Sequence, residues 1–464
     1  QGYSSAASDV YKRQEIYTNI TNREERNKMK KFTVCLLIGA MAASMLTGCG
    51  SNGGSSDSSD SKADSSSETM TIMMNGSDSD AYMEGYRKII DGFNESNEYG
   101  VKVEIQNVTN SDYKTKLTTM MASDSETDII FTWELGYLEN FVNGDKIVSL
   151  QKYLDEDEEW KNSFNGGILD PLTYDGEVYA IPTQQSTAIM YYNKAIFDKY
   201  GLEVPTTYDE YVQVCDTLKE NGVTPVALAS TADDAWLVSQ YIQQLSDGIK
   251  GEDLFNSIKG GTGKWNDEGM VEAGKLFQEE VNKGYFEDGF TGVSREEAQL
   301  QFANGQTAMY FNGCWEISNL DKKENAAEAE NISCFLMPAV NEEYAGVEVG
   351  SVDTSYAITK NCKNVDAAVA LLKYMTNEES TSSLLYDYGR FPSTNIDIDD
   401  SKLTPLCADF VNLLGDAKAQ TPWFDRVDTD LGNEFNNTAI GIANGDDVQE
   451  AFDTLQSYAE SKSK

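Results

Sequence analysis

The most informative side chain for chemistry is one that the sequence lacks. None of its 464 residues is a histidine. Imidazole is the general base of Ser-His-Asp and Cys-His catalysis and a frequent ligand of zinc. The sequence therefore excludes both kinds of catalytic centre, and every metal site that depends on imidazole.

The cysteines do not point to a redox or metal centre. Two of the seven, Cys35 and Cys49, belong to an N-terminal segment that is treated below. The others are odd in number and include no Cys-x-x-Cys pair, which argues against a full disulfide framework and a thiolate metal site. We expect most of them to be small buried apolar residues. They are Cys215, Cys314, Cys334, Cys362 and Cys407.

Two short segments resemble ligand-binding motifs but lack essential residues. A phosphate-binding loop ending at Lys264 needs Ser or Thr next, where the sequence has Trp265. An EF-hand loop starting at Asp397 needs glycine five positions on, where the sequence has Lys402. Paired carboxylates can hydrolyse glycosides, but among 77 acidic residues some pair always has a suitable spacing. We therefore predict no catalytic residue, no bound metal and no cofactor.

The balance of charge is strongly acidic. Asp and Glu number 77 and Lys and Arg 36, so the formal net charge is −41. Such a surface repels phosphate backbones and lacks the cations that would release their counterions. We therefore expect no nucleic acid among the partners.

The N-terminal part has the pattern of an export signal. Residues 1–28 precede the first methionine, Met29, and we expect them to be a non-native extension. Lys30 and Lys31 then give a basic start to an apolar run that ends at Leu46. The run is short for a membrane span and suits the core of a signal peptide.

The apolar run ends in the residues LTGC, of which the last is Cys49. This ending resembles a bacterial lipobox, which implies that residues 29–48 are a lipoprotein signal peptide and that Cys49 carries lipid. Residues 49–68 are rich in Ser, Gly and Asp and read as the lipidated cysteine and a flexible tether. No later run is long enough to span a bilayer, so we expect attachment to the membrane through lipid alone.

Beyond the tether, alternating strands and helices must position any functional side chain. A strand over 69–75, an amphipathic helix over 82–93, and strands over 101–105 and 128–133 predict an α/β lobe. Later helices are expected over 207–218, opened by a Thr207–Glu210 capping box, and over 365–375 and 448–459. A chain of this length exceeds what one core usually holds, so we expect two lobes.

Five segments carry a resemblance to a known family. They are DIIFTWELGYLENFVNGDKIVSLQKYL from Asp128, YDGEVYAIPTQQSTAIMYYNKAIFDKYGLEVPTTYDEYVQVCDTLKENGVTPVAL from Tyr174, FANGQTAMYFNGCWEI from Phe302, VGSVDTSYAITKNCKNVDAAVALLKYM from Val349 and GRFPS from Gly389. In this order and spacing they resemble the family 1 extracellular solute-binding proteins of bacterial ABC transporters, the maltose-binding-protein-like group. The resemblance covers most of residues 70–464.

The resemblance implies an α/β, periplasmic-binding-protein-like fold of two lobes, with a multi-strand hinge and a ligand cleft between the lobes. Lobe I would comprise residues 69–184 plus 351–393, and lobe II residues 185–350 plus 394–464. The chain would cross between them near 183–186, 349–352 and 392–395.

The function implied is binding and not catalysis. A carbohydrate, expected to be an oligosaccharide, would be captured in the cleft and delivered to the transmembrane subunits of an ABC permease. The protein would be a monomer, held by its lipid on the extracytoplasmic face of the bacterial cell membrane.

The chemistry of sugars suggests which residues on the matching segments bind ligand. Sugars present flat patches of C–H groups, which aromatic rings cover, and hydroxyl groups, which polar side chains bind. The aromatic candidates are Trp133, Trp236, Trp315 and Trp423, and the polar candidates are Glu134, Gln184, Gln185, Asp234, Asp353 and Arg390. Trp160 and Trp265 match no cleft segment, so we expect them to pack in the core.

Other functions stay open at the level of sequence. A polyamine-binding protein would need carboxylates beside aromatic rings. The sequence is compatible with that alternative, because it offers Glu134, Asp233, Asp234 and Asp353. Iron binding is disfavoured by the absence of histidine. A secreted glycoside hydrolase would turn over a glycan, whereas an adhesive or structural lipoprotein would need neither a cleft nor a ligand.

Overall fold

Strands β1 (Glu68–Asn75) and β2 (Val101–Val108), with helix α2 (Ala81–Ser96) between them, form the predicted β-α-β unit. The two strands pair in parallel along their whole length. The apolar stripe of α2, which includes Tyr86 and Phe93, is buried. The helical spacing of these side chains therefore becomes one face of the helix against the sheet.

The computed structural model describes residues 68–123, 127–321, 329–415 and 417–462, all within the compact unit Ser66–Lys464. The predictions made for residues 1–67, including lipidation of Cys49, lie outside the described residues. Within the described residues, no helix is both long and apolar enough to cross a membrane.

One mixed sheet of nine strands runs through the molecule. Its order is β2-β1-β3-β10-β6-β8-β7, with β11 beside β10 and β9 beside β6. The remaining strands of this sheet are β3 (Ile129–Thr132), β6 (Ile181–Asn193), β7 (Thr224–Ala227), β8 (Thr307–Gly313), β9 (Ile332–Phe335), β10 (Val347–Ile358) and β11 (Ala419–Thr421). A separate hairpin consists of β4 (Thr173–Tyr174) and β5 (Glu177–Val178).

The buried apolar residues form two cores. The first core contains those from Met70 to Ile181, apart from Leu135, and from Val352 to Leu384, together with Tyr388. The second core contains Leu135 and the buried apolar residues of the other segments, from Ala188 to Val349 and from Leu385 to Leu455 apart from Tyr388. Two separate cores are what the length of the chain predicts.

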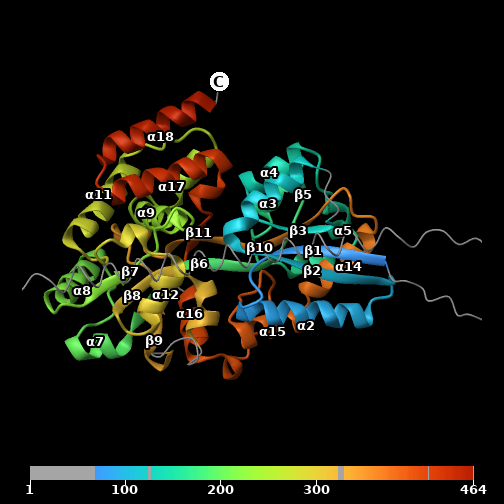
Figure 1. Ribbon diagram of the computed structural model, residues 1–464, viewed down its shortest axis with the longest axis horizontal. Helices are drawn as coiled ribbons and strands as arrows, with labels where there is room; N and C mark the ends of the chain where they lie inside the picture. The colour runs from blue at the N-terminus through green and yellow to red at the C-terminus, as the bar shows by residue number, and fades with distance from the viewer. Residues whose placement is uncertain (1–67, 124–126, 322–328, 416, 463–464) are drawn as a thin grey trace, which may run out of the picture. The chain divides into compact units, whose positions relative to one another are not determined.

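Each core has its own set of helices, and Figure 1 shows the two sets on opposite sides of the view. The helices whose buried residues lie mainly in the first core are α2, α3 (Asn110–Ala122), α4 (Gly136–Asn143), α5 (Gln151–Asp155), α6 (Glu158–Ser163), α14 (Val365–Met375) and α15 (Glu378–Tyr388). Those of the second core are α7 (Lys194–Tyr200), α8 (Tyr208–Glu220), α9 (Ala235–Lys250), α10 (Glu252–Lys259), α11 (Glu268–Lys283), α12 (Arg295–Ala303), α13 (Ile317–Leu320), α16 (Pro405–Leu414), α17 (Thr429–Ala443) and α18 (Val448–Lys462). Short 3-10 turns connect several of these elements.

Strands β6 and β10 belong to both cores. The start of β6 contributes Ile181 to the first core, and its later residues Ala188–Tyr191 belong to the second. The two strands pair in antiparallel fashion, with Ser186 opposite Ser351, and Gln184 also bridges to Pro392. The three segments that the sequence predicts as crossings are thus neighbours in space.

Helix termini follow the local sequence signals. The Thr207 hydroxyl accepts from the backbone N–H of Glu210, and the Glu210 side chain bonds back to the N-cap, so the capping box is confirmed. Helix α14 spans the predicted residues, and α18 extends slightly beyond its predicted end. In each case an amphipathic stripe and a capping residue fixed the helix locally.

The residues expected to be structural are structural. Trp160 is buried in the first core and donates its indole N–H to Thr376. Trp265 is buried in the second core against Phe424 and Phe435. All five cysteines of the described residues are buried and free.

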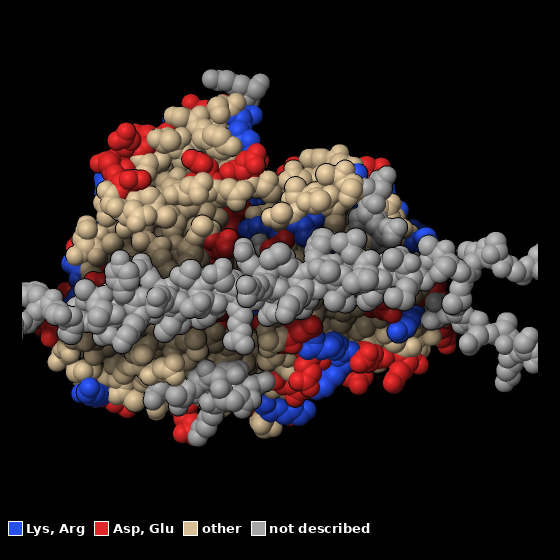
Figure 2. Space-filling view, viewed as in Figure 1, with Lys and Arg blue, Asp and Glu red and all other residues tan. Residues whose placement is uncertain are grey.

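The acidic composition is visible on the surface. Figure 2 shows Asp and Glu gathered over the part of the second core where α11, α17 and α18 run. Lys and Arg are sparser on that part of the face. This distribution agrees with the net charge of −41.

Candidate ligand-binding site

Three of the four candidate tryptophans lie together. Trp236 stands in the first turn of α9, Trp315 in a 3-10 turn after β8, and Trp423 two residues after β11. The rings of Trp236 and Trp423 are stacked, with centroids 5.4 Å apart and an interplanar angle of 7°. Trp315 lies at a tilt to both, 5.9 Å from Trp236 and 5.4 Å from Trp423. We call these three residues the tryptophan cluster.

A glycine makes room for one ring of the tryptophan cluster. A Cβ atom at Gly313 would lie 2.0 Å from the ring of Trp315. No side chain fits at that distance, so the indole lies directly against the glycine backbone. The sequence Asn-Gly-Cys-Trp therefore allows Trp315 to fold back toward the cluster.

Two polar atoms of the tryptophan cluster are buried without a partner. The indole N–H groups of Trp236 and Trp423 have no hydrogen-bond acceptor within the described part of the chain. A buried donor left unpaired costs about 1–3 kcal/mol. The fold of the described residues therefore leaves two unpaired indole donors within the tryptophan cluster.

A buried ion pair lies beside the tryptophan cluster. The guanidinium of Arg426 lies over the Trp423 ring, 3.9 Å from the ring centroid. Its Nη1 donates to Glu134 Oε1 at 3.1 Å and to the carbonyl of Val352 at 2.7 Å. Arg426 therefore joins the segment after β3, the middle of β10 and the segment that carries Trp423.

The candidate Glu134 has both carboxylate oxygens engaged inside the protein. One accepts from Arg426, and the other accepts from the Ser351 hydroxyl at 2.6 Å and the Val352 N–H at 3.3 Å. Burial raises the pKa of Glu134, while Arg426 and Ser351 oppose that rise. In this arrangement Glu134 orders its neighbours rather than offering a free acceptor.

The residues after Glu134 reach from the first core to the second. Leu135 has φ 53°, a left-handed conformation that costs a branched side chain strain, and it packs in the second core. A Cβ at Gly136 would lie 2.8 Å from the Cα of Asp428. Asn140 of α4 also donates to Thr429 of α17 at 3.3 Å. The two cores are thus in contact close to the Glu134–Arg426 pair.

A second group of candidates forms one polar network. The Nε of Arg390 donates to Gln184 at 2.8 Å, and its Nη2 pairs with Asp353 at 2.5 Å. The same guanidinium lies over the ring of Tyr82, 4.5 Å from its centroid. Burial raises the pKa of the Tyr82 phenol, and the cationic Arg390 opposes that rise. The Nε2 of Gln184 is buried without a partner within the described residues.

The remaining candidates are more dispersed. Trp133 packs in the first core against Phe131 at a ring distance of 4.8 Å. Asp234 accepts from the Thr231 hydroxyl and from the Arg295 backbone N–H, so it holds the start of α9 in place. Gln185 is half-buried, and its backbone N–H bonds to Phe391. Among the described ring contacts, Trp133 has none with the tryptophan cluster, and Asp234 and Gln185 bond to other residues.

Sequence reasoning missed Arg426. It lies three residues after Trp423, and its side chain is 2% exposed. Arginine is almost never fully buried unless it is paired, so burial is what marks this residue. Only its position next to the Pro-Trp-Phe segment hinted at a role in the sequence.

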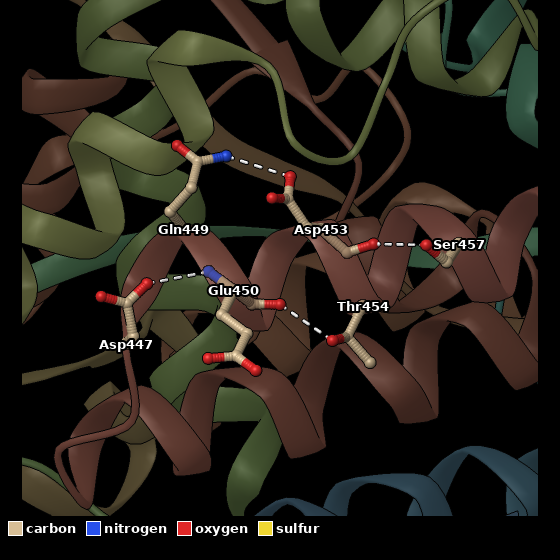
Figure 3. A pocket seen from close by; sticks show the side chains of 6 residues that line it. All are labelled: Asp447, Gln449, Glu450, Asp453, Thr454 and Ser457. Carbon is tan, nitrogen blue, oxygen red and sulfur yellow. Dashed lines mark hydrogen bonds between the residues drawn. The ribbon is translucent and has the colours of Figure 1, made fainter.

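Two surface pockets lie away from these residues. One of about 400 Å³ runs along the exposed face of α18 (Figure 3). Its side chains are engaged with the helix itself, as in the bond from Gln449 to Asp453 and that from Thr454 to the Glu450 carbonyl. The other, of about 560 Å³, lies beside the start of β1. Neither lining contains a tryptophan, so neither competes with the tryptophan cluster as a sugar site.

The described residues do not group as a metal site. Among them no three or more Asp, Glu or Cys side chains are placed to hold one ion. The chemistry that the site offers is stacking by aromatic rings and hydrogen bonding by indole, amide, guanidinium and carboxylate groups.

Comparison with known proteins decides the family. Residues 76–382 match the family described as bacterial extracellular solute-binding protein. The chain belongs to this family. The solute-binding proteins act outside the cytoplasm, and the predicted resemblance is confirmed.

Individual solute-binding proteins are similar over much of the chain. An uncharacterised ABC transporter extracellular-binding protein of Pyrococcus horikoshii is 25% identical over 308 residues, 64% of this chain and 69% of that protein. The multiple sugar-binding protein of Streptococcus mutans is 28% identical over 240 residues, 50% of this chain and 54% of that protein.

A solved structure extends the match to the fold. It comes from work on xylan utilisation by the thermophilic bacterium Caldanaerobius polysaccharolyticus. It has a TM-score of 0.77 and 27% identity, and covers 84% of this chain and 99% of that chain. The predicted α/β fold of the two-lobed solute-binding proteins is therefore confirmed.

Proposed function

We propose that this solute-binding protein captures an oligosaccharide at the tryptophan cluster and delivers it to the permease of an ABC sugar importer. The observation that carries the proposal is the meeting of Trp236, Trp315 and Trp423 from three separate elements. Indole faces cover the C–H patches of sugar rings, and the two unpartnered indole N–H groups suit hydroxyl oxygens. The sugar-binding relative in Streptococcus mutans supports the same class of ligand.

The charge at the cluster favours a sugar over a polyamine. The group stacked on Trp423 is a guanidinium, which repels a cationic ligand. The carboxylate of Glu134 is already paired with that guanidinium. A neutral polyhydroxyl ligand is not repelled by the guanidinium and does not need a free carboxylate. Its binding requires no covalent step.

We further propose that residues 69–184 plus 351–393 and residues 185–350 plus 394–464 move as lobes. The pairing of β6 with β10 and of Gln184 with Pro392 supports a hinge at the three crossings. On this proposal the network of Gln184, Asp353 and Arg390 lies at the hinge and binds the ligand from the side of lobe I.

The proposal includes a lipid anchor at Cys49 and a monomeric protein. The basic start, the apolar run and the LTGC residues support the anchor. Labelling of cells with an azide-bearing palmitate analogue should mark the protein. The Cys49→Ser variant should be unlabelled and should no longer sediment with membranes.

The binding proposal is tested with the domain that starts near Thr69. A thermal-shift screen with xylo-, malto- and chito-oligosaccharides and with spermidine selects ligands, because binding to the folded state alone raises the melting temperature. Calorimetry should then show that Trp423→Ala weakens binding of the selected sugar by about 10-fold or more. Trp160→Phe, in the other core, should leave the affinity unchanged.

Two results would contradict the proposal. One is a response to spermidine alone, with an affinity that falls as salt is added. The other is an equal loss of sugar affinity in the Trp423→Ala and Trp160→Phe variants.

A further inference from the structure

The backbone around Trp423 is held by a glutamine that no motif marks. The side-chain amide of Gln243 donates to the Pro422 carbonyl at 2.9 Å and accepts from the Phe424 N–H at 2.7 Å. Gln243 thus bonds to the residue on each side of Trp423. Its own side chain is fully buried.

The sheet does not hold this segment. Strand β11 ends at Thr421, and Pro422 has no N–H to donate to a neighbouring strand. The amide of Gln243 replaces the missing strand partner with one donor and one acceptor. The main chain at Trp423 is therefore fixed by α9 rather than by β10.

The same helix carries the ring on which Trp423 stacks. Trp236 and Gln243 are seven residues apart on α9, which is about two turns, so they share one face. One rigid element thus sets both the Trp236 ring and the position of the Trp423 backbone. The two indoles lie at an interplanar angle of 7°.

We propose that Gln243 is a positioning residue for ligand binding, because it keeps Trp423 stacked on Trp236 as a ready-made platform. This inference rests on the proposed function of the tryptophan cluster. The stacking itself can be measured without any sugar, so the two ideas can fail separately.

The chain provides a matched control in the next residue. Gln244 donates to the Val347 carbonyl at 3.1 Å and accepts from the Val349 N–H at 2.9 Å. It is also buried, at 3% exposed, and makes the same two kinds of backbone bond. The residue that it brackets, however, is Glu348 rather than a tryptophan.

The test compares Gln243→Met with Gln244→Met, each of which keeps the side-chain length and loses the hydrogen bonds of the amide. For Gln243 these include a bond to the Thr421 hydroxyl at 3.3 Å. Stacked indoles give an exciton couplet in the far-ultraviolet circular dichroism spectrum. The part of the couplet that disappears in Trp236→Phe is the signal of the stacked pair. We expect Gln243→Met to lose most of this signal and Gln244→Met to keep it. If Gln243→Met does not fold, Gln243→Asn, whose amide is too short to reach both groups, replaces it.

The second measurement is the affinity for the oligosaccharide that gives the largest thermal shift, or for xylotriose if none does so. Gln243→Met should bind it roughly 3- to 10-fold more weakly, while Gln244→Met binds as the parent does. An unchanged couplet in Gln243→Met, or an equal loss in both variants, would overturn the inference. A couplet lost only in Gln243→Met, with no sugar bound by the parent, would support the positioning and refute the sugar proposal.

Discussion

At the scale of single residues, the Glu134–Arg426 pair is the most consequential contact. Both side chains are buried, with exposures of 0% and 2%, and Arg426 also lies over Trp423. Removing one partner of a buried ion pair leaves the other charge without compensation. Because these residues come from segments 292 positions apart, their pairing ties the two cores together beside the proposed site.

The first prediction concerns this pair. Arg426→Met should lower the free energy of unfolding by about 3–5 kcal/mol, and the double variant with Glu134→Gln should recover part of the loss. Urea denaturation at neutral pH measures both. Lys102→Met, which breaks the exposed Lys102–Glu104 pair, should cost less than about 1 kcal/mol. Equal costs for Arg426→Met and Lys102→Met would contradict the prediction.

A second residue-scale prediction concerns pH. Burial raises the pKa of Asp247 to about 8, with Glu252 adding to the rise and Thr421 opposing it. The buried Glu348 nearby also has a raised pKa, from burial and from Asp247. In the unfolded chain an aspartate has a pKa of about 3.9. The folded state therefore binds more protons between the two values, so the stability that Asp247 contributes is fully present below about pH 4 and is lost as pH rises to about 8.

The Asp247→Asn variant tests the sign of this effect. Its free energy of unfolding should fall less steeply with pH than that of the parent, by up to about 1.4 kcal/mol per pH unit. Denaturation series at several pH values give the slopes. The exposed Asp91→Asn change should leave the slope unaltered. An unchanged slope in Asp247→Asn would show that the carboxyl is already ionised in the folded protein at these pH values.

At the scale of elements, the position of the Trp423 segment depends on how closely α17 approaches it. A Cβ at Gly432, in the first turns of α17, would lie 1.9 Å from the Asp425 carbonyl oxygen. That atom belongs to the backbone between Trp423 and α17, so it can yield only if the whole segment moves. Helix α17 and the 3-10 turn that contains Asp425 are therefore packed backbone to backbone.

The third prediction compares two glycines of α17. Gly432→Ala should destabilise the protein by about 1–3 kcal/mol and weaken sugar binding, because Asp425 and Trp423 must shift together. At Gly441 the atoms nearest to an added Cβ all belong to the Asp446 side chain, whose carboxylate can turn away. Gly441→Ala should gain up to about 1 kcal/mol from helix propensity. Thermal denaturation and calorimetry check both, and reversed signs would contradict this account of the packing.

At the scale of the whole molecule, ligand binding is a question of how two lobes share one ligand. The fold is that of the two-lobed solute-binding proteins. A ligand that contacts both lobes binds the closed form more tightly and shifts the population toward it. The Arg390 network and the tryptophan cluster would then meet the ligand from opposite sides.

The fourth prediction is compaction on binding. Small-angle scattering should show a smaller radius of gyration when saturating oligosaccharide is added to the parent domain. Trp423→Ala at the same sugar concentration should show less of the change, because less of the protein is occupied.

The affinity should barely depend on ionic strength, since a neutral sugar forms no screened charge pair despite the net charge of −41. No compaction at saturation would contradict closure of the lobes.

Local patterns in the sequence were enough to identify most of the elements and the family. The helical spacing of α2 and α14, the Thr207–Glu210 capping box and the alternation in β2 are local signals, and each was confirmed. These signals are visible in the sequence because the residues on the buried face of a helix or strand recur at a fixed spacing along the chain. The ordered segments that matched the family gave the fold in the same way. Trp160 and Trp265 were also correctly assigned to the cores.

Which candidates lie together depends on the tertiary structure. It joined Trp236, Trp315 and Trp423, separated Trp133 from them, and showed that the carboxylate of Glu134 is taken by Arg426. It also revealed the Gln243 amide on either side of Trp423. These contacts join residues far apart in the chain, between which no periodic pattern runs. Their partners are set by how the sheet brings α9, β10 and the segment after β11 together, which is a property of the packed fold and not of any local stretch.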